Sequence, residues 1–192
     1  SGVAKFLTSF YNLDLKANYD KVKILDCTLR DGGHLNNCEF DYSTIKKIIQ
    51  NLSNSNIDII EIGFLEDCIY DKNKTRFNYV YEANNLLSEI DLKNSIISLL
   101  VQVDKYDINI DYFSIVDTFG LLLNNDFNNK LNLINNLLRN DINVGLHLHD
   151  NLSSAFGAAQ ILMQKNTRYK NVIIDSAVLG MGRDPGNLKT EL

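Results

Sequence analysis

Short apolar runs alternate with amphipathic segments along the chain from Lys21 to Leu192. The apolar runs are nearly continuous and rich in branched residues, which is typical of strands buried on both faces. Strands that alternate with helices in this way pack as a parallel sheet covered by helices. The sequence therefore predicts an α/β fold with six strand segments, which are residues 22–28, 57–64, 95–103, 111–120, 142–151 and 171–182.

Helices are expected between these strands. In residues 41–56 the apolar residues recur with the i, i+3, i+4, i+7 spacing of an amphipathic helix, and Ser43 or Thr44 is a candidate for its N-terminal cap. The other expected helices are residues 78–90, 127–140 and 152–165.

The chain is short for a complete eightfold β/α barrel, which takes about 250 residues, or roughly 31 per unit. From Lys21 onward there is room for about five and a half such units. Only about eight residues, Asp104 to Asp111, separate two of the predicted strands, whereas a parallel crossover needs about a dozen or more. We therefore expect one incomplete domain over residues 21–192, with a leader segment over residues 1–20.

The composition excludes several classes of partner. The chain has 19 basic and 24 acidic residues and a formal net charge of −5, so it offers no basic field for nucleic acid or for an anionic membrane surface. No window approaches the roughly 18 apolar residues of a membrane span, and no signal-peptide pattern opens the chain. We expect a cytoplasmic protein whose cysteines, Cys27, Cys38 and Cys68, are reduced and structural.

The three histidines of the chain all fall where predicted strands end. In barrels and open α/β sheets, functional sites assemble at the carboxyl ends of the strands. In "GLHLHDN", His147 and His149 are two residues apart on a strand, so their imidazoles project from the same face. Such a pair can bind one divalent cation, although an H-x-H pair alone is at least as often a hydrogen-bonded structural pair.

Two further residues offer oxygen ligands. Asp31 follows the first strand, and Asn187 follows the last. Two nitrogens and two oxygens, with open positions for water or substrate, suit Mg²⁺ or Mn²⁺ better than a closed zinc site rich in thiolates. Zn²⁺ and Co²⁺ stay as alternatives.

The stretch "RDGGH" surrounds Asp31 with other groups that carry chemistry. Arg30 has a guanidinium suited to an oxyanion or a carboxylate. Gly32 and Gly33 allow backbone conformations that other residues avoid, which suits a turn or the close approach of a ligand. His34 can act as a general acid or base near neutral pH.

Two acidic residues on buried-looking strands, Glu61 and Asp117, either line the cavity or are hydrogen-bonded within the sheet. The sequence does not decide between these two possibilities. The segment "GMGRDPG" has the wrong spacing for a dinucleotide-binding turn and no clear helix after it, so we expect no nucleotide site there.

Taken in order, five linked motifs resemble the HMGL-like family, or DRE-TIM metallolyases, which includes 4-hydroxy-2-oxovalerate aldolase and hydroxymethylglutaryl-CoA lyase. The resemblance runs from about Lys21 to Leu192 and implies a TIM-type (β/α) barrel from which two middle strands, near residues 104–111, are missing. The motifs are "LDCTLRDGGHLNN", "EIGFLEDCIYDKNKTRFN", "YFSIVDTFG", "GLHLHDNLSSAFGAA" and "GMGRDPGNLKTE".

The resemblance also implies roles for single residues. It implies that a divalent metal is bound by Asp31, His147, His149 and, as in the lyase branch, Asn187. Arg30 matches the arginine that stabilises a pyruvate-type enolate. His34 matches the histidine that takes the proton of the substrate hydroxyl in the hydroxy-oxoacid aldolases. The implied reaction is the metal-assisted cleavage or formation of a carbon–carbon bond in a 4-hydroxy-2-oxo acid.

The chain departs from both branches of the family. The segment "LGMGRDPGN" lacks the cysteine that the lyase branch carries before its asparagine, which argues against thioester lyase chemistry. The C-terminal region that supplies a tyrosine in the aldolase branch is not present in this sequence. The resemblance is therefore closest to the proteins like 4-hydroxy-2-oxovalerate aldolase.

Two other functions stay open at this point. A non-catalytic relative that keeps the metal motifs would act in assembly or regulation, and the exposed sheet edges at the gap would favour a homo-oligomer. A metal-dependent hydrolase is less well supported, because the H-x-H pair of such barrels lies on the first strand and here it lies late in the chain.

Overall fold

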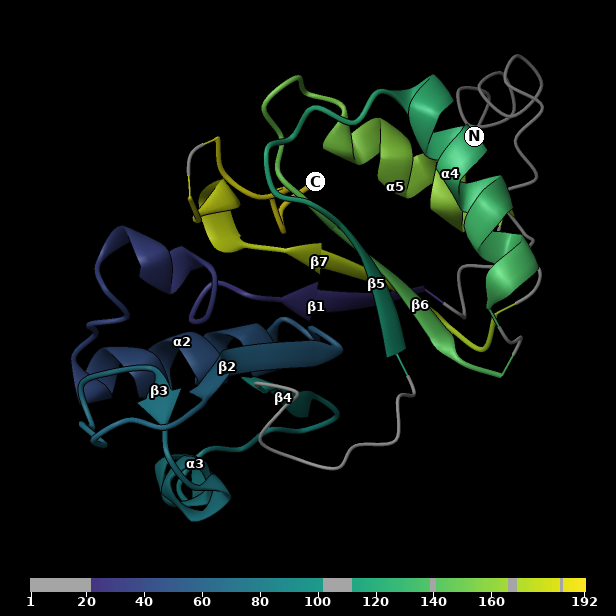
Figure 1. Cartoon of the computed structure of the whole chain (residues 1–192). Coiled ribbons are helices and arrows are strands. Elements are labelled where there is room, and N and C mark those ends of the chain that lie inside the picture. The colour runs from purple at the N-terminus through teal and green to yellow at the C-terminus, as the bar shows by residue number, and fades with distance from the viewer. Residues whose placement is uncertain (1–21, 102–111, 139–140, 166–168, 184) are drawn as a thin grey trace, which may run out of the picture.

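The computed structural model describes residues 22–101, 112–138, 141–165, 169–183 and 185–192 (Figure 1). Its centre is one sheet of seven strands in the order β3-β2-β1-β7-β6-β5, with β4 also paired to β2. All of these strand pairs are parallel. The strands are β1 (Val22–Asp26), β2 (Ile59–Leu65), β3 (Arg76–Phe77), β4 (Ile96–Val101), β5 (Tyr112–Asp117), β6 (Asn143–Leu148) and β7 (Val172–Ser176).

The six predicted strands are all present, and so are the four predicted helices. The helices are α2 (Tyr42–Asn54), α3 (Val80–Leu87), α4 (Asn124–Leu137) and α5 (Ala155–Lys165). The predicted cap of the first helix is wrong, because α2 already begins at Tyr42 and Asp41 takes the cap position. Strand β3 was not predicted, because two residues are too short to show a period. The leader, residues 1–20, and the short connection, residues 104–111, lie outside the described residues.

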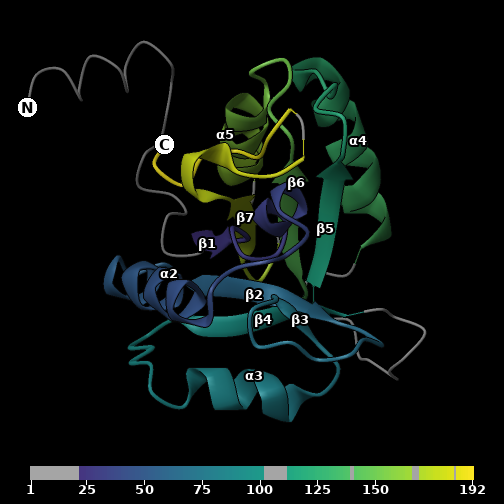
Figure 2. The same cartoon turned by 90° about the vertical axis from the view of Figure 1, so that its left-hand side faces the viewer.

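The helices cover the outer face of the sheet in two groups (Figure 2). Helices α4 and α5 pack on β5, β6 and β7 through a core in which Phe127, Val144 and Ala158 are fully buried. Helices α2 and α3 pack on β2 and β3 through a second core around Ile49 and Ile60. This burial of strands under helices is the reason that their sequences read as continuous apolar runs.

The sheet curls into a half-barrel that does not close. Among the described residues, β4 pairs only with β2 and β5 pairs only with β6, so each has one unpaired edge. The expected incomplete TIM-type barrel is thus confirmed. The division into a leader and a domain over residues 21–192 stays a prediction.

Residue 63 in strand β2 has a backbone conformation that requires glycine. It lies at φ 151°, where side chains are strained, and the pairing of β2 with β4 changes register around it. A Cβ atom at this position would lie 2.0 Å from the carbonyl oxygen of Thr75, which neighbours it at the start of β3. The irregularity in β2 therefore depends on glycine.

We predict that Gly63→Ala lowers the free energy of unfolding by about 1 to 3 kcal/mol, because both the backbone angle and the contact with Thr75 become unfavourable. Denaturant unfolding followed by circular dichroism measures this change. Gly157→Ala is the matched control, since Gly157 lies inside helix α5, where alanine is favoured by up to about 1 kcal/mol. Equal stability of Gly63→Ala and the wild type would contradict the prediction.

Candidate metal centre and active-site cavity

The first side chain of the site comes from the turn after β1. The backbone N–H groups of Arg30 and Asp31 both donate to the carbonyl of Cys27, which turns the chain back over the strand end. Gly32 and Gly33 follow in the 3₁₀ turn η2 (Gly32–Leu35). This tight turn places Asp31 in a buried position at the carboxyl end of the sheet.

Gly32 and Gly33 lie in a turn, as predicted, but they do not adopt backbone angles that require glycine. Neither has a positive φ, so their unusual backbone freedom is not used. Both are buried, and a Cβ atom on Gly32 would lie 3.1 Å from the Cβ of Met181. A Cβ atom on Gly33 would lie 3.1 Å from the sulfur of Cys38. The glycines provide space for close packing around the site.

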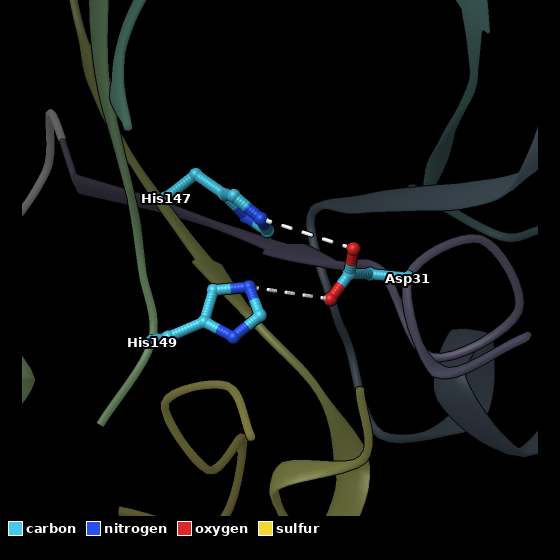
Figure 3. A group of neighbouring side chains, drawn as sticks. All are labelled: Asp31, His147 and His149. Atoms are coloured by element: carbon cyan, nitrogen blue, oxygen red, sulfur yellow. Dashed lines mark ion pairs between the residues drawn. The ribbon is translucent and has the colours of Figure 1, made fainter. Parts of the chain in front are cut away.

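The H-x-H pair meets Asp31 across the half-barrel (Figure 3). Nε2 of His147 lies 4.0 Å from Oδ1 of Asp31, and Nε2 of His149 lies 3.7 Å from Oδ2. All three residues are buried, and one ligand atom from each lies within 4.8 Å of the other two. Three ligand atoms at such distances surround a space suited to one cation, so Asp31, His147 and His149 are a candidate metal site.

The imidazole of His149 is oriented by the backbone. Its Nδ1 lies 3.2 Å from the carbonyl oxygen of Arg183, which can only accept a hydrogen bond. Nδ1 therefore carries the proton, and the lone pair of Nε2 faces Asp31. Burial and the neighbouring His147 lower the pKa of His149, although Asp31 opposes this shift. The neutral form that binds a metal is favoured.

Asn187 lies on the other side of Asp31. Its Nδ2 donates to Oδ2 of Asp31 at 2.6 Å and to the carbonyl of Met181 at 2.7 Å. Its Oδ1 is buried, and no hydrogen-bond partner is found for it among the described residues. Because a buried amide oxygen without a partner is costly, this atom fits a cation ligand. Asn187 therefore lies beside the cluster, and its role as a metal ligand stays a prediction.

The charge of Asp31 is stabilised inside the protein. Burial acts to raise the pKa of its carboxyl group, but the hydrogen bond from Asn187 and the positive charge of Arg30 outweigh burial, and the pKa is lowered. Asp31 is thus held in the ionised form that a metal requires.

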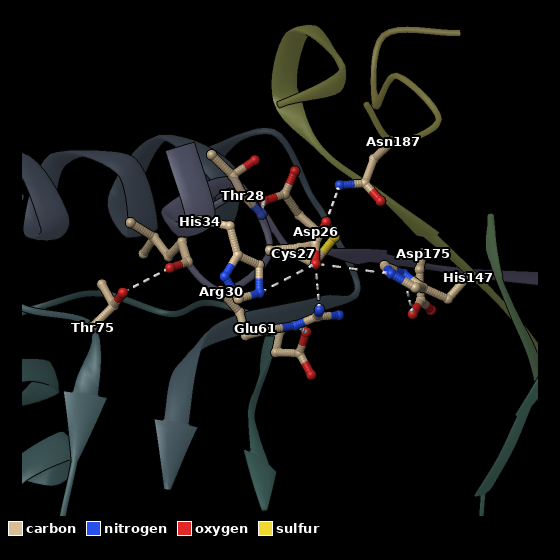
Figure 4. A network of polar contacts seen from close by, with 12 residues as sticks. Asp26, Cys27, Thr28, Arg30, His34, Glu61, Thr75, His147, Asp175 and Asn187 are labelled. Carbon is tan, nitrogen blue, oxygen red and sulfur yellow. Dashed lines mark hydrogen bonds and ion pairs between the residues drawn. The ribbon is translucent and has the colours of Figure 1, made fainter. Parts of the chain in front are cut away.

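Arg30 and Glu61 form a buried ion pair beside the metal cluster (Figure 4). Nε of Arg30 donates to Glu61 at 2.6 Å, and Nη1 donates to Asp31 at 2.8 Å. Burial raises the pKa of Glu61, and the charge of Arg30 opposes that shift. Among the described residues these two carboxylates are the hydrogen-bond partners of the guanidinium, which leaves Nη2 for a ligand.

His34 lies at the rim of the site. Its Nε2 is 3.9 Å from Oδ1 of Asp31, and its ring packs on Phe64. Burial and the charge of nearby Arg183 lower its pKa, so the neutral imidazole is favoured. Its side chain is 19% exposed, about twice as much as that of His147, and this combination of access and neutrality suits a general base.

A cavity of about 390 Å³ opens beside these residues on the inner face of the sheet. Its polar lining includes Arg30, Glu61, His147 and Asp175, and apolar side chains such as Ile59 and Ile173 also line it. Glu61 therefore has both of the roles considered from the sequence, since it lines the cavity and forms an ion pair with Arg30. The side chain of Asp117 instead accepts a hydrogen bond from the backbone N–H of Leu122, in the loop that follows β5.

Two residues near His147 were missed in the sequence. Asp175 on β7 lies against Nδ1 of His147, and Tyr112 on β5 donates to Asp175. Asp175 is a lone acidic residue in an apolar strand, the same signal that drew attention to Glu61, and it was available in the sequence. Nothing in the local sequence marks Tyr112.

No cysteine belongs to the candidate metal site, which is Asp31, His147 and His149. None of the three cysteines forms a disulfide among the described residues, and the buried Sγ of Cys27 donates to the carbonyl of Ser176. Burial raises the pKa of the Cys27 thiol well above its usual range.

In the described part of the chain, no helix has the length and apolar character needed to cross a membrane.

Comparison with known proteins gives a family and a fold. The model of the HMGL-like family matches residues 72–192. The N-terminal domain of a candidate aldolase from Bacteroides vulgatus has a TM-score of 0.66 and 22% identity, over 88% of this chain and 77% of that one. HMG-CoA lyase from Bacillus subtilis has a TM-score of 0.61 and 15% identity, over 92% of this chain and 85% of that one. None of the curated proteins matches the chain.

The two solved structures support the fold. The family match covers only some of the residues of the candidate site. The matched range includes His147, His149 and Asn187, whereas Arg30 and Asp31 precede it. Only the tertiary structure joins the two sets of residues.

We predict that the protein binds one Co²⁺ or Mn²⁺ ion per chain and that Asp31→Asn or His147→Ala weakens binding by more than about 100-fold, because each change removes a ligand. Isothermal titration calorimetry measures the affinity. His34→Gln is the matched control, because the third histidine lies outside the cluster of ligand atoms and its variant should keep the metal. Unchanged binding in His147→Ala would exclude this site.

Proposed function

Because the chain belongs to the HMGL-like family, we propose that it is a divalent-metal-dependent carbon–carbon lyase of the aldolase type, which acts on a 4-hydroxy-2-oxo acid through a pyruvate-type enolate. The proposal rests on one observation. Asp31, from the turn after β1, meets His147 and His149, from the end of β6, beside a cavity lined by Arg30.

The ligand set supports a hard divalent cation. It contains two imidazoles and a carboxylate, with the amide oxygen of Asn187 as the fourth group, and it contains no thiolate. Mn²⁺ or Mg²⁺ fits this set, and Zn²⁺ or Co²⁺ is an alternative. A cation bound there would supply Lewis-acid stabilisation of the oxygen that becomes the enolate.

Arg30 is proposed to bind the oxo-acid end of the substrate. Two of its nitrogens are fixed by Glu61 and Asp31, so the guanidinium is already oriented before substrate arrives. Its burial strengthens the attraction for an anion. The negative charge that develops on the enolate oxygen is where this interaction lowers the barrier most.

His34 is proposed to move the proton. The neutral imidazole accepts the proton of the 4-hydroxyl group as the bond between C3 and C4 breaks, which releases an aldehyde and leaves the electron pair in the pyruvate enolate. Return of one proton to C3, equivalent to the one that His34 took from the hydroxyl group, then gives pyruvate. The apolar part of the cavity, which includes Ile59 and Ile173, is proposed to receive the aldehyde and to exclude water.

A non-catalytic assembly module is the second candidate, and the unpaired edges of β4 and β5 favour it. Such edges are available to pair with another chain, so the predicted homo-oligomer is compatible with either function. The cytoplasmic location also stays a prediction.

We predict metal-dependent release of pyruvate from a panel of 4-hydroxy-2-oxo acids that differ in their aldehyde portion. Arg30→Lys should lower kcat by about 10²- to 10³-fold, because lysine cannot hold both carboxylates and an oxyanion in one plane. His34→Gln should lower it by about 10²- to 10⁴-fold, because the base is removed. Coupled detection of pyruvate gives both rates.

Arg76→Lys is the control for the arginine variant. Arg76 also pairs with a glutamate, Glu66, but it lies outside the lining of the cavity, and activity should stay within about twofold of the wild type. Metal binding without pyruvate release from any acid in the panel would reject the aldolase and favour the assembly module.

A further inference from the structure

Polar side chains from three neighbouring strands form a series of contacts that ends at the metal cluster. Nδ1 of His147 lies 3.3 Å from Oδ2 of Asp175 (Figure 4). The other oxygen of Asp175, Oδ1, accepts a hydrogen bond of 3.1 Å from the hydroxyl of Tyr112. These contacts lead from β5 through β7 to His147 on β6, whose opposite nitrogen faces Asp31.

The fold provides a path for Tyr112 across strand β6. Ser114 of β5 pairs with Gly145 of β6, so Gly145 lies diagonally ahead of Tyr112 in the sheet. A Cβ atom on Gly145 would lie 1.9 Å from the hydroxyl oxygen of Tyr112. The phenol therefore passes directly over the backbone of Gly145, and glycine at this position is what allows it to reach Asp175.

Nδ1 of His147 is buried and makes no hydrogen bond of good geometry among the described residues, and the carboxylate of Asp175 is the acceptor that lies beside it. A carboxylate accepts hydrogen bonds and does not donate them, so an imidazole that turns slightly to complete this contact carries its proton on the nitrogen beside Asp175. That nitrogen is Nδ1, which leaves the lone pair on Nε2, the atom that faces Asp31. His149 is held by the carbonyl of Arg183 instead, so the two histidines are oriented by different groups.

The carboxylate of Asp175 has no Lys or Arg partner among the described residues. Among the described residues its polar contacts are Tyr112 and His147, and neither is a permanent cation. The buried guanidinium of Arg30 is hydrogen-bonded to Glu61 and Asp31. A buried carboxylate without a cationic partner is unfavourable, whereas an imidazole bound to a divalent cation becomes a strongly polarised donor.

We propose that Asp175 and Tyr112 are positioning residues for the metal site. Asp175 fixes the tautomer and the ring orientation of His147, and Tyr112 fixes the carboxylate of Asp175. The inference rests on the proposed function, since it requires His147 to be a metal ligand. Neither residue belongs to the cluster of Asp31, His147 and His149, although both line the cavity beside it.

Binding of Co²⁺ to the whole chain tests this proposal. The affinity is measured by competition with a fluorescent chelator, and the visible spectrum of the bound ion reports the geometry of its ligands. Asp175→Asn should weaken Co²⁺ binding by about 10- to 100-fold and change the spectrum. Tyr112→Phe should act in the same direction, by up to about tenfold, and the double variant should bind no more weakly than Asp175→Asn alone, because both changes affect one series of contacts.

Two control variants make the same chemical changes elsewhere. Asp58→Asn alters a carboxylate that binds Lys23 and the backbone of Ile24 at the opposite end of the sheet. Tyr169→Phe removes a phenol hydroxyl that donates to Asn135 in the core beneath the helices. Both should bind Co²⁺ as the wild type does, with the same spectrum.

The outcomes separate this inference from the proposed function. Wild-type affinity and spectrum in Asp175→Asn would overturn the inference and leave the metal site intact. Failure of the wild type to bind Co²⁺ would overturn the metal site and the inference together. If circular dichroism shows that Asp175→Asn is unfolded, Tyr112→Phe decides, and unchanged binding in that variant overturns the proposal.

Discussion

The carboxylate of Asp31 holds together three parts of the chain that are distant in sequence. It accepts hydrogen bonds from Arg30 and Asn187, and the imidazoles of His147 and His149 face its two oxygens. Since the group is buried, these partners replace the hydration that it loses, and without them the ionised form would be strongly disfavoured. The arrangement of the strand ends around the site therefore depends on this one charge.

The balance of charge around Asp31 favours a bound cation. The buried carboxylates of Asp31 and Glu61 share one buried guanidinium, that of Arg30, and a third buried carboxylate, Asp175, lies beside His147. A divalent ion between Asp31 and the histidines would supply the two positive charges that this group lacks. The outer face of the sheet, in contrast, is packed with apolar side chains under the helices.

Sequence reasoning succeeded where a local pattern reflects the environment and failed where a contact comes from another strand. The apolar runs identified all six long strands, because burial on both faces leaves a continuous signal. Gly32 and Gly33 were expected to supply unusual backbone angles, yet they supply space against Met181 and Cys38, which are distant or lie across a turn. Tyr112 was missed because its reach depends on Gly145 in the next strand.

The sequence by itself determined the alternation of strands and helices, the side-by-side projection of His147 and His149, and the presence of Asp31 at a strand end. Those features follow from periods of two and of about 3.6 residues, which act over a few positions. Only the tertiary structure decided that β1, β6 and β7 are neighbours in the order that brings Asp31, His147 and Asp175 together. Strand order is set by the packing of the whole sheet and its helices, and no single segment of the sequence carries it.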